Sequence, residues 1–224
     1  MSKSNAIIAS YLGTMIFASL LFISAGKLYY WQGLLFLLLS IIGTTLNHLL
    51  LPKHSTLNEE RINKTHGGVP WDKTLLMLYF LISLCAFIIA GLDSGRFYWT
   101  NNVPLFLTIT GSITTFAGQL IFAFSKRENT FFSSTVQIQT EKKHTVCTTG
   151  LYKYVRHPGY LGMSISMISF PLVLDSLLSF IPAVMCVIIL VMRTNKEDSY
   201  LKAKLDGYSV YSEKTKWKLI PFFF

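Results

Sequence analysis

The chain has 224 residues, of which 51% are hydrophobic and only 14% are charged. Ordinary soluble domains contain about 25% charged residues, so this composition excludes a disordered chain and argues against a soluble fold. The 20 lysines and arginines outnumber the 11 acidic residues and give a net charge of +9. Because these basic residues lie between apolar runs, the charge indicates membrane topology rather than nucleic-acid binding.

Four apolar runs are each long enough to cross a hydrocarbon core of about 30 Å. We predict spanning helices at residues 5–26, 28–51, 74–92 and 104–124. A fifth run, 158–192, is too long for one simple span. Pro171, Asp175 and Ser176 interrupt it, so we expect a hairpin of two short helices at 159–174 and 177–192.

The predicted fold class is therefore an all-α polytopic bundle of about six spans, in a single membrane domain covering residues 1–224. Residues 1–124 form its four-helix part, and 125–224 supply a loop, the hairpin and a tail. The first 26 residues could also be a signal peptide, but the apolar run is long for one and further spans follow.

The distribution of basic residues predicts the orientation. With six spans, 18 of the 20 lysines and arginines share one side, in the amino terminus, the loops 52–73 and 125–157, and the tail 193–224. Only Lys27 and Arg96 lie on the other side. By the positive-inside rule, both termini are expected in the cytoplasm.

Ionisable and thiol groups within the apolar runs are few. His48 and Asp175 lie near helix ends, and we interpret them as interfacial residues rather than as a proton relay. Cys85, Cys147 and Cys186 have no ligand spacing, so the sequence predicts neither a disulfide framework nor a metal site.

Tyrosine, basic and imidazole side chains gather in residues 150–162, at the entrance of the expected hairpin. Pro158 suits the first turn of a helix, where the free backbone amides can receive an anion, and His157 would stand beside them. The alternative interpretation is an anchor that faces lipid headgroups.

A second polar cluster follows the hairpin. Arg193 and Glu197 lie on one helical face, so a plain intrahelical ion pair worth about 0.2–0.5 kcal/mol is the simplest interpretation. If the two hairpin helices are antiparallel, however, the residues around His157 and Arg193 meet at the same membrane edge.

These residues resemble a known family. The run Arg156-His157-Pro158-Gly159-Tyr160, then Arg193 and Glu197, and a Tyr-x-x-Tyr tail that ends in Leu-Ile-Pro are similar to the isoprenylcysteine carboxyl methyltransferase family and its bacterial relatives. The similarity extends in order from Gln137 to Pro221. It implies an integral-membrane methyltransferase that uses S-adenosylmethionine, expected in a bacterial inner membrane.

The resemblance also implies roles for individual residues. Arg193 matches the position that meets the substrate, and His157 belongs to the catalytic motif. Asp198 stands where the family usually has a second glutamate. The family's cofactor contacts fall on Gln137, His144, Thr145, Val146, Cys147, Tyr152, His157, Pro158, Gly159, Tyr160 and Glu197.

A cofactor with a sulfonium centre, an ammonium group and ribose hydroxyls needs an acid and aromatic walls, which these positions supply. The glycine-rich turn of a dinucleotide fold is absent from the sequence. The expected methyl acceptor is the carboxylate of an apolar or lipid-linked molecule such as an isoprenylcysteine, reached from membrane lipid. Phospholipid N-methylation, an NADPH-dependent reductase of the sterol type, and a transporter or scaffold are the alternatives.

Overall fold

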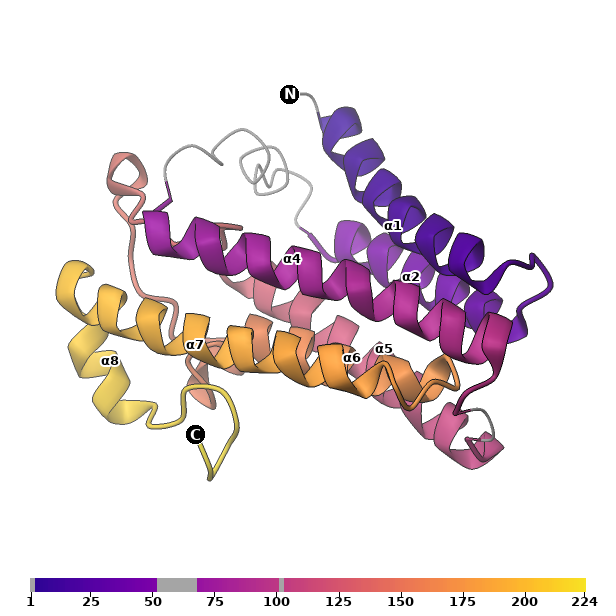
Figure 1. The fold of residues 1–224 in the computed structure, drawn as a ribbon. Coiled ribbons are helices and arrows are strands. Elements are labelled where there is room, and N and C mark those ends of the chain that lie inside the picture. The colour runs from indigo at the N-terminus through magenta and orange to yellow at the C-terminus, as the bar shows by residue number, and fades with distance from the viewer. Residues whose placement is uncertain (1–2, 52–67, 101–102) are drawn as a thin grey trace.

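The computed structural model describes residues 3–51, 68–100 and 103–224. Every regular element in these ranges is helical, so the predicted all-α bundle is confirmed (Figure 1). The α-helices are α1 (Lys3–Ala25), α2 (Trp31–Leu49), α4 (Pro70–Ala90), α5 (Leu105–Glu128), α6 (Pro158–Val173), α7 (Phe180–Lys204) and α8 (Tyr208–Lys214). Shorter elements are a π-helix, η1 (Gly91–Phe97), and two 3-10 turns, η2 (Thr140–Lys142) and η3 (Gly150–Lys153).

Within the described ranges, four helices are long and apolar enough to cross a membrane: α1, α2, α4 together with η1, and α5. They match the four predicted spans to within a few residues at most ends. The shorter apolar helix α6 and the apolar first half of α7 pack beside them. Three of the basic residues that we counted in the loop 52–73, Lys53, Arg61 and Lys64, lie outside the described residues.

The predicted hairpin is confirmed, with its break at the expected place. Helix α6 ends at Val173, and Asp175 adopts the left-handed backbone conformation, with φ of 55°, that turns the chain toward α7. The expected end of the second helix at 192 is wrong. Helix α7 continues to Lys204, because hydropathy marks only the apolar part, and the polar part that follows contains several good helix formers, lysine, arginine and glutamate. Arg193, Glu197 and Asp198 therefore lie on one continuous helix.

A close crossing of α5 and α6 fixes the position of the hairpin. A Cβ atom on Gly118 would stand 2.6 Å from the Gly162 carbonyl oxygen, and one on Gly162 would stand 2.5 Å from that of Gly118. No larger residue fits at either position without moving the backbone. Small residues permit this kind of approach between membrane helices.

One end of the bundle closes around the α6–α7 turn. Asp93, in the unforeseen π-helix η1, is fully buried and accepts hydrogen bonds from the Ser176 hydroxyl at 2.6 Å and the Thr100 amide at 2.8 Å. The Asp175 carboxylate accepts one from the Val103 amide at 2.7 Å. Asp175 thus links the α6–α7 turn to the segment just before α5, which is a structural role at the end of the bundle.

The opposite end gathers segments that are distant in sequence. The Val69 amide, just before α4, donates to the Val136 carbonyl at 3.3 Å. The amides of Arg156 and His157 donate to the carbonyls of Trp217 and Lys218, both at 2.9 Å. The start of α4, the loop after α5 and the carboxyl-terminal tail therefore share one end of the bundle. This agrees with the distribution of basic residues, which placed these segments on the same side of the membrane.

Candidate active site

A pocket lies at this second end, between the loop after α5, the start of α6, the end of α7, and α8. Its empty space, including the part open to solvent, is about 790 Å³. Ten of the eleven residues predicted to bind a cofactor line it: Gln137, His144, Thr145, Val146, Cys147, Tyr152, His157, Gly159, Tyr160 and Glu197. The eleventh, Pro158, is buried in the first turn of α6 and does not line the pocket.

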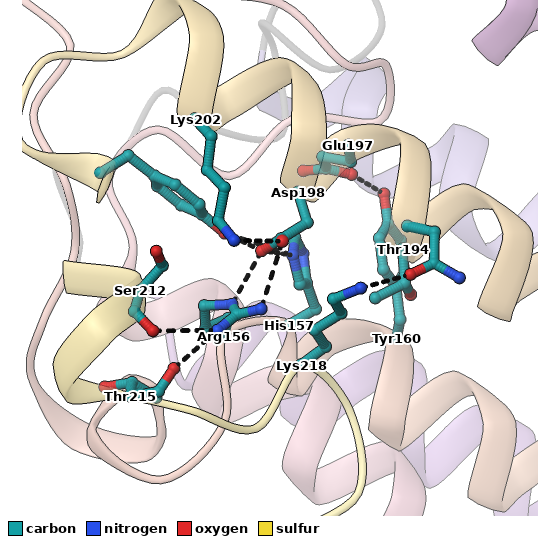
Figure 2. Close-up of polar contacts among 12 residues, drawn as sticks. Arg156, His157, Tyr160, Thr194, Glu197, Asp198, Lys202, Ser212, Thr215 and Lys218 are labelled. Carbon is teal, nitrogen blue, oxygen red and sulfur yellow. Dashed lines mark hydrogen bonds and ion pairs between the residues drawn. The ribbon is translucent and has the colours of Figure 1, made fainter. Parts of the chain in front are cut away.

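Glu197 faces the start of α6. The Tyr160 hydroxyl donates to its carboxylate at 2.5 Å, across the hairpin (Figure 2). The interpretation of Arg193 and Glu197 as a simple intrahelical ion pair is wrong, since each side chain has a partner on another helix. The predicted meeting of the His157 and Glu197 regions at one edge is confirmed.

Asp198, next to Glu197, is buried and holds the tail in place. The Arg156 guanidinium donates to both of its oxygens, Nε at 2.7 Å and Nη2 at 3.2 Å, and the Tyr208 hydroxyl donates at 3.0 Å (Figure 2). Burial alone would raise the pKa of the Asp198 carboxyl. The hydrogen bond and charge of His157, the charge of Arg156 and the bond from Tyr208 outweigh burial and hold this pKa well below its usual range.

Arg156 also binds the tail directly. Its Nη1 donates to the backbone carbonyls of Ser212, Thr215 and Lys216 at 3.2, 2.9 and 3.1 Å. Arg156 is 6% exposed, so these bonds and the Asp198 pair satisfy a cation that is almost entirely withdrawn from water. Asp198 is thus the counter-ion of the motif arginine, which gives the acid at this position a structural role.

His157 lies between the tail and the pocket. Its ring stacks on Tyr160 with 5.8 Å between centroids, and its Nε2 lies 3.3 Å from the Tyr208 hydroxyl. The amides of Tyr160 and Leu161 bond to the His157 carbonyl at 3.1 and 3.2 Å. These two amides are therefore occupied within the first turn of α6.

Arg193 does not line the pocket. Its Nε and Nη2 donate to the two carboxylate oxygens of Asp72 at 2.6 and 3.2 Å, and Nη2 also donates to the Ser134 carbonyl at 2.7 Å. The guanidinium stands 5.0 Å from the centre of the Tyr160 ring. Arg193 therefore lies over a face of the ring whose hydroxyl binds Glu197.

Asp72 is the site residue that sequence reasoning missed. It is fully buried in the first turn of α4, and besides binding Arg193 it accepts a hydrogen bond from the Val136 amide at 2.8 Å. Acidic residues are common in the first turn of a helix, where they interact favourably with the helix dipole. The sequence position of Asp72 therefore gives no sign that its partner lies on α7. Asp72 joins α4, α7 and the loop that forms one wall of the pocket.

The remaining walls are aromatic and uncharged. Burial raises the pKa values of Tyr152, Tyr208 and Tyr211 well above the ordinary value, so these phenols stay protonated. Burial lowers the pKa of His144, whose ring stacks on Phe131 at 4.3 Å between centroids. A neutral aromatic lining suits a cationic ligand, because ring faces attract positive charge.

One buried polar atom of the lining has no partner. The Thr135 hydroxyl oxygen, on a residue that is 6% exposed, has no hydrogen-bond partner among the described residues. Buried hydroxyls are normally paired, so this atom is available to a bound molecule.

Comparison with known proteins gives one family match. Residues 109–203 match the model of the isoprenylcysteine carboxyl methyltransferase (ICMT) family, which begins within α5 and ends within α7. No curated protein matches the chain. The matched region contains all of the predicted cofactor and substrate residues, from Gln137 to Glu197. The segment 109–203 of this membrane protein is therefore similar to the isoprenylcysteine carboxyl methyltransferase family.

Proposed function

We propose that the protein is an integral-membrane methyltransferase that uses S-adenosylmethionine to methylate a carboxylate of an apolar or lipid-linked acceptor, such as an isoprenylcysteine. The main support is that ten residues at the family's cofactor positions, spread from Gln137 to Glu197, line one pocket. In this proposal residues 1–124 supply most of the membrane bundle, and residues 125–224 supply the cofactor-binding part.

The lining fits S-adenosylmethionine chemically. The Glu197 carboxylate can accept hydrogen bonds from an ammonium or ribose hydroxyl group, and the unpartnered Thr135 hydroxyl offers a further polar contact. Tyr152, Tyr160 and Tyr208 give aromatic surfaces that favour a sulfonium cation. The ammonium, ribose and sulfonium groups of the ligand thus have suitable partners in the pocket.

When bound, this cofactor supplies a methyl group whose bond to sulfur breaks as a bond to the acceptor oxygen forms. The protein's own residues orient the reactants. The Tyr160 hydroxyl holds Glu197 and the face of its ring contacts Arg193, so one aromatic side chain positions both the acid and the cation. Such fixed geometry accounts for much of the rate gain in bimolecular reactions.

Arg193 is proposed to favour a negatively charged acceptor near the pocket. Its charge is already compensated in part by Asp72, which also fixes the direction of its side chain. Since a carboxylate acceptor is an anion and already nucleophilic, a positioned cation is more useful to it than a general base.

The proposal includes both termini in the cytoplasm. The grouping of the start of α4, the loop after α5 and the tail at one end of the bundle supports it, since these segments are basic. Reporter fusions at the tail and near Asp175 should report opposite sides of the membrane. A tail found outside would contradict this orientation.

Isothermal titration of the purified protein with S-adenosylmethionine and with its demethylated product tests the cofactor assignment. A folded preparation that gives no heat and no thermal shift at millimolar ligand would overturn it. A methyl-transfer screen with labelled cofactor, using prenylcysteine analogues in one arm and a membrane lipid extract in the other, tests the acceptor. Labelling of lipid amines alone would favour phospholipid N-methylation.

A further inference from the structure

Residues 219–224 fold into a turn, which we call the tail turn. The amides of its first two residues both donate to the Phe224 carbonyl, at 2.8 and 2.9 Å, so its backbone has a defined shape. Ile220 is 44% exposed, and Phe222 and Phe223 are 87% and 83% exposed. Phe222 also has a φ of 65°, which is unfavourable for a bulky residue. The turn thus holds two aromatic rings away from the bundle, an arrangement that is unfavourable in water and favourable in lipid.

The tail turn stands at the depth of the membrane surface. The Lys218 ammonium, just before the turn, donates to the Asn195 side-chain oxygen of α7 at 2.6 Å. Asn195 follows Met192, the last residue of the apolar run in α7, by about 4.5 Å along the helix axis. Since a headgroup layer is about 5–7 Å thick, Asn195 and the tail bound to it lie within that layer. In Figure 1 the yellow tail accordingly runs beside the bundle and not beyond its end.

Two tryptophans stand at the same level. The Lys196 ammonium, one residue after Asn195, lies 5.6 Å from the centre of the Trp71 ring in the first turn of α4. Trp217 precedes the lysine that binds Asn195, and it has a lysine on either side. No acidic side chain occurs in residues 215–224. Tryptophan is enriched in the headgroup layer, and anionic headgroups attract basic segments, so the tail fits the surface of a bilayer.

The tail is also attached to the wall of the pocket. The amides of Arg156 and His157 donate to the carbonyls of Trp217 and Lys218, both at 2.9 Å. The Arg156 guanidinium donates to carbonyls of α8 and of the tail as well (Figure 2). His157 lines the pocket. A contact that holds the tail in place therefore also holds Arg156 and His157 in place.

We propose that the tail turn inserts Phe222 and Phe223 into the surface of the lipid bilayer, and that this anchoring stabilises the pocket wall at Arg156 and His157. The partner of this surface is a bilayer with anionic headgroups. The contact with lipid does not depend on the proposed function, because it follows from the depth, exposure and charge of the tail.

Photocrosslinking tests the contact with lipid. The photoreactive residue p-benzoylphenylalanine replaces Phe223 in the whole chain, in nanodiscs of phosphatidylcholine and phosphatidylglycerol, and lipid adducts are measured by intact mass spectrometry. The same residue in place of Phe80, an exposed ring of the spanning helix α4, is the positive control. In place of Val210, which is 57% exposed on α8, it is the negative control.

Position 223 is expected to form about ten times more lipid adduct than position 210, the ratio for burial of a ring worth about 1.4 kcal/mol. Its adducts should resemble those at position 80. Equal lipid adducts at positions 223 and 210 would overturn the proposal. Crosslinking of position 223 to a second copy of the chain in place of lipid would also overturn it.

Hydrogen exchange tests the link to the pocket wall. The double variant Phe222→Ser with Phe223→Ser removes both rings and keeps the lysines of the tail. In nanodiscs, the amides of Arg156 and His157 should exchange about tenfold faster in this variant than in the wild type, because their acceptors lie in the tail. Val210→Ser, which removes an exposed apolar side chain elsewhere, should leave this exchange unchanged. Equal exchange in the double variant and the wild type would overturn the stabilising role of the tail.

Cofactor titration keeps this inference apart from the proposed function. In nanodiscs, the double variant should bind S-adenosylmethionine about tenfold more weakly than the wild type, since His157 lines the pocket. Equal affinities would overturn the stabilising role of the tail. If neither protein binds the cofactor although position 223 forms lipid adducts, the proposed function is overturned and the contact with the bilayer stands.

Discussion

The two ends of the helical bundle both bury acidic side chains, but they stabilise them differently. At the α6–α7 turn, Asp93 is surrounded by neutral donors, among them the Ser176 hydroxyl and the Thr100 amide. At the pocket end, Asp72 and Asp198 each bind an arginine with two bonds. The first end is closed by neutral hydrogen bonds to a buried carboxylate. The second is held by ion pairs around an open pocket, which is the arrangement expected where charged ligands bind.

The ion pair between Arg193 and Asp72 should give the largest effect. Arg193→Ala leaves a fully buried carboxylate without its cation, so we expect a loss of about 3–5 kcal/mol in the free energy of unfolding, followed by thermal or denaturant unfolding in detergent. The double variant Arg193→Met with Asp72→Leu should recover most of the stability, because apolar replacements of a buried pair are often neutral.

Turnover separates the structural role of this pair from its proposed role at the site. The double variant should remain poorly active while it binds cofactor nearly as the wild type does. Full recovery of turnover together with stability would show that Arg193 serves only the fold.

Asp198 tests the pocket end in a second way. Asp198→Ala should cost about 3–5 kcal/mol, because Arg156 would be left buried with only carbonyl partners. It should also weaken cofactor binding, since Tyr208 and His157 lose their shared partner. Asp206→Ala removes an exposed acid just after the same helix and is the matched control. Similar effects of the two substitutions would contradict the role of Asp198 as counter-ion.

Glu197→Gln should affect the ligand more than the fold. If the carboxylate binds a cationic or hydroxyl group of the cofactor, the loss of a charged hydrogen bond should weaken binding by about 1.5–3 kcal/mol in isothermal titration. Glu213→Gln, on the exposed face of α8, is the control and should leave binding unchanged. Unchanged binding in Glu197→Gln would assign the cofactor contact to other residues.

Asp93→Asn tests the end without ion pairs. Asparagine replaces an acceptor with a donor that faces donors, so we expect a loss of about 1–3 kcal/mol in stability but no change in cofactor affinity. The measurement is unfolding in parallel with titration. A matching loss of cofactor affinity would show that the two ends are coupled and are not the independent regions described above.

The smallest effect concerns acid stability. The folded-state pKa of Asp198 lies below its ordinary value of 3.8, so its stabilising contribution is complete above about pH 4 and is lost as the pH falls below that value. Unfolding measured between pH 3 and pH 6 should show this decline in the wild type and a flatter profile in Asp198→Asn. Equal slopes in the two proteins would contradict the lowered pKa.

Local patterns predicted a large part of the fold and of the pocket. Hydropathy located four long helices, and Pro171 with Asp175 located the turn of the hairpin, because the membrane requires continuous apolar runs and helix breakers interrupt them. The motif from Arg156 to Tyr160 and the acid at Glu197 predicted a common site, since two antiparallel helices joined by a short turn must bring their far ends together.

Pairing among the buried charges could not be predicted in the same way. The i, i+4 spacing of Arg193 and Glu197 suggested an ion pair, but Arg193 instead binds Asp72, which is 121 residues away in sequence. Helical spacing gives only the neighbours on one helix, whereas burial selects partners according to which helices pack together. The extension of α7 to Lys204 was missed for a related reason, because hydropathy does not register a polar helix.

The sequence by itself therefore determined the helical membrane architecture, the hairpin and the residues that share the pocket, since these follow from hydropathy, helix breakers and an ordered motif. Only the tertiary structure decided that Asp72 holds Arg193 and that Asp198 holds Arg156. These arrangements depend on how helices distant in sequence cross, and a buried polar group takes the partner that packing brings within reach.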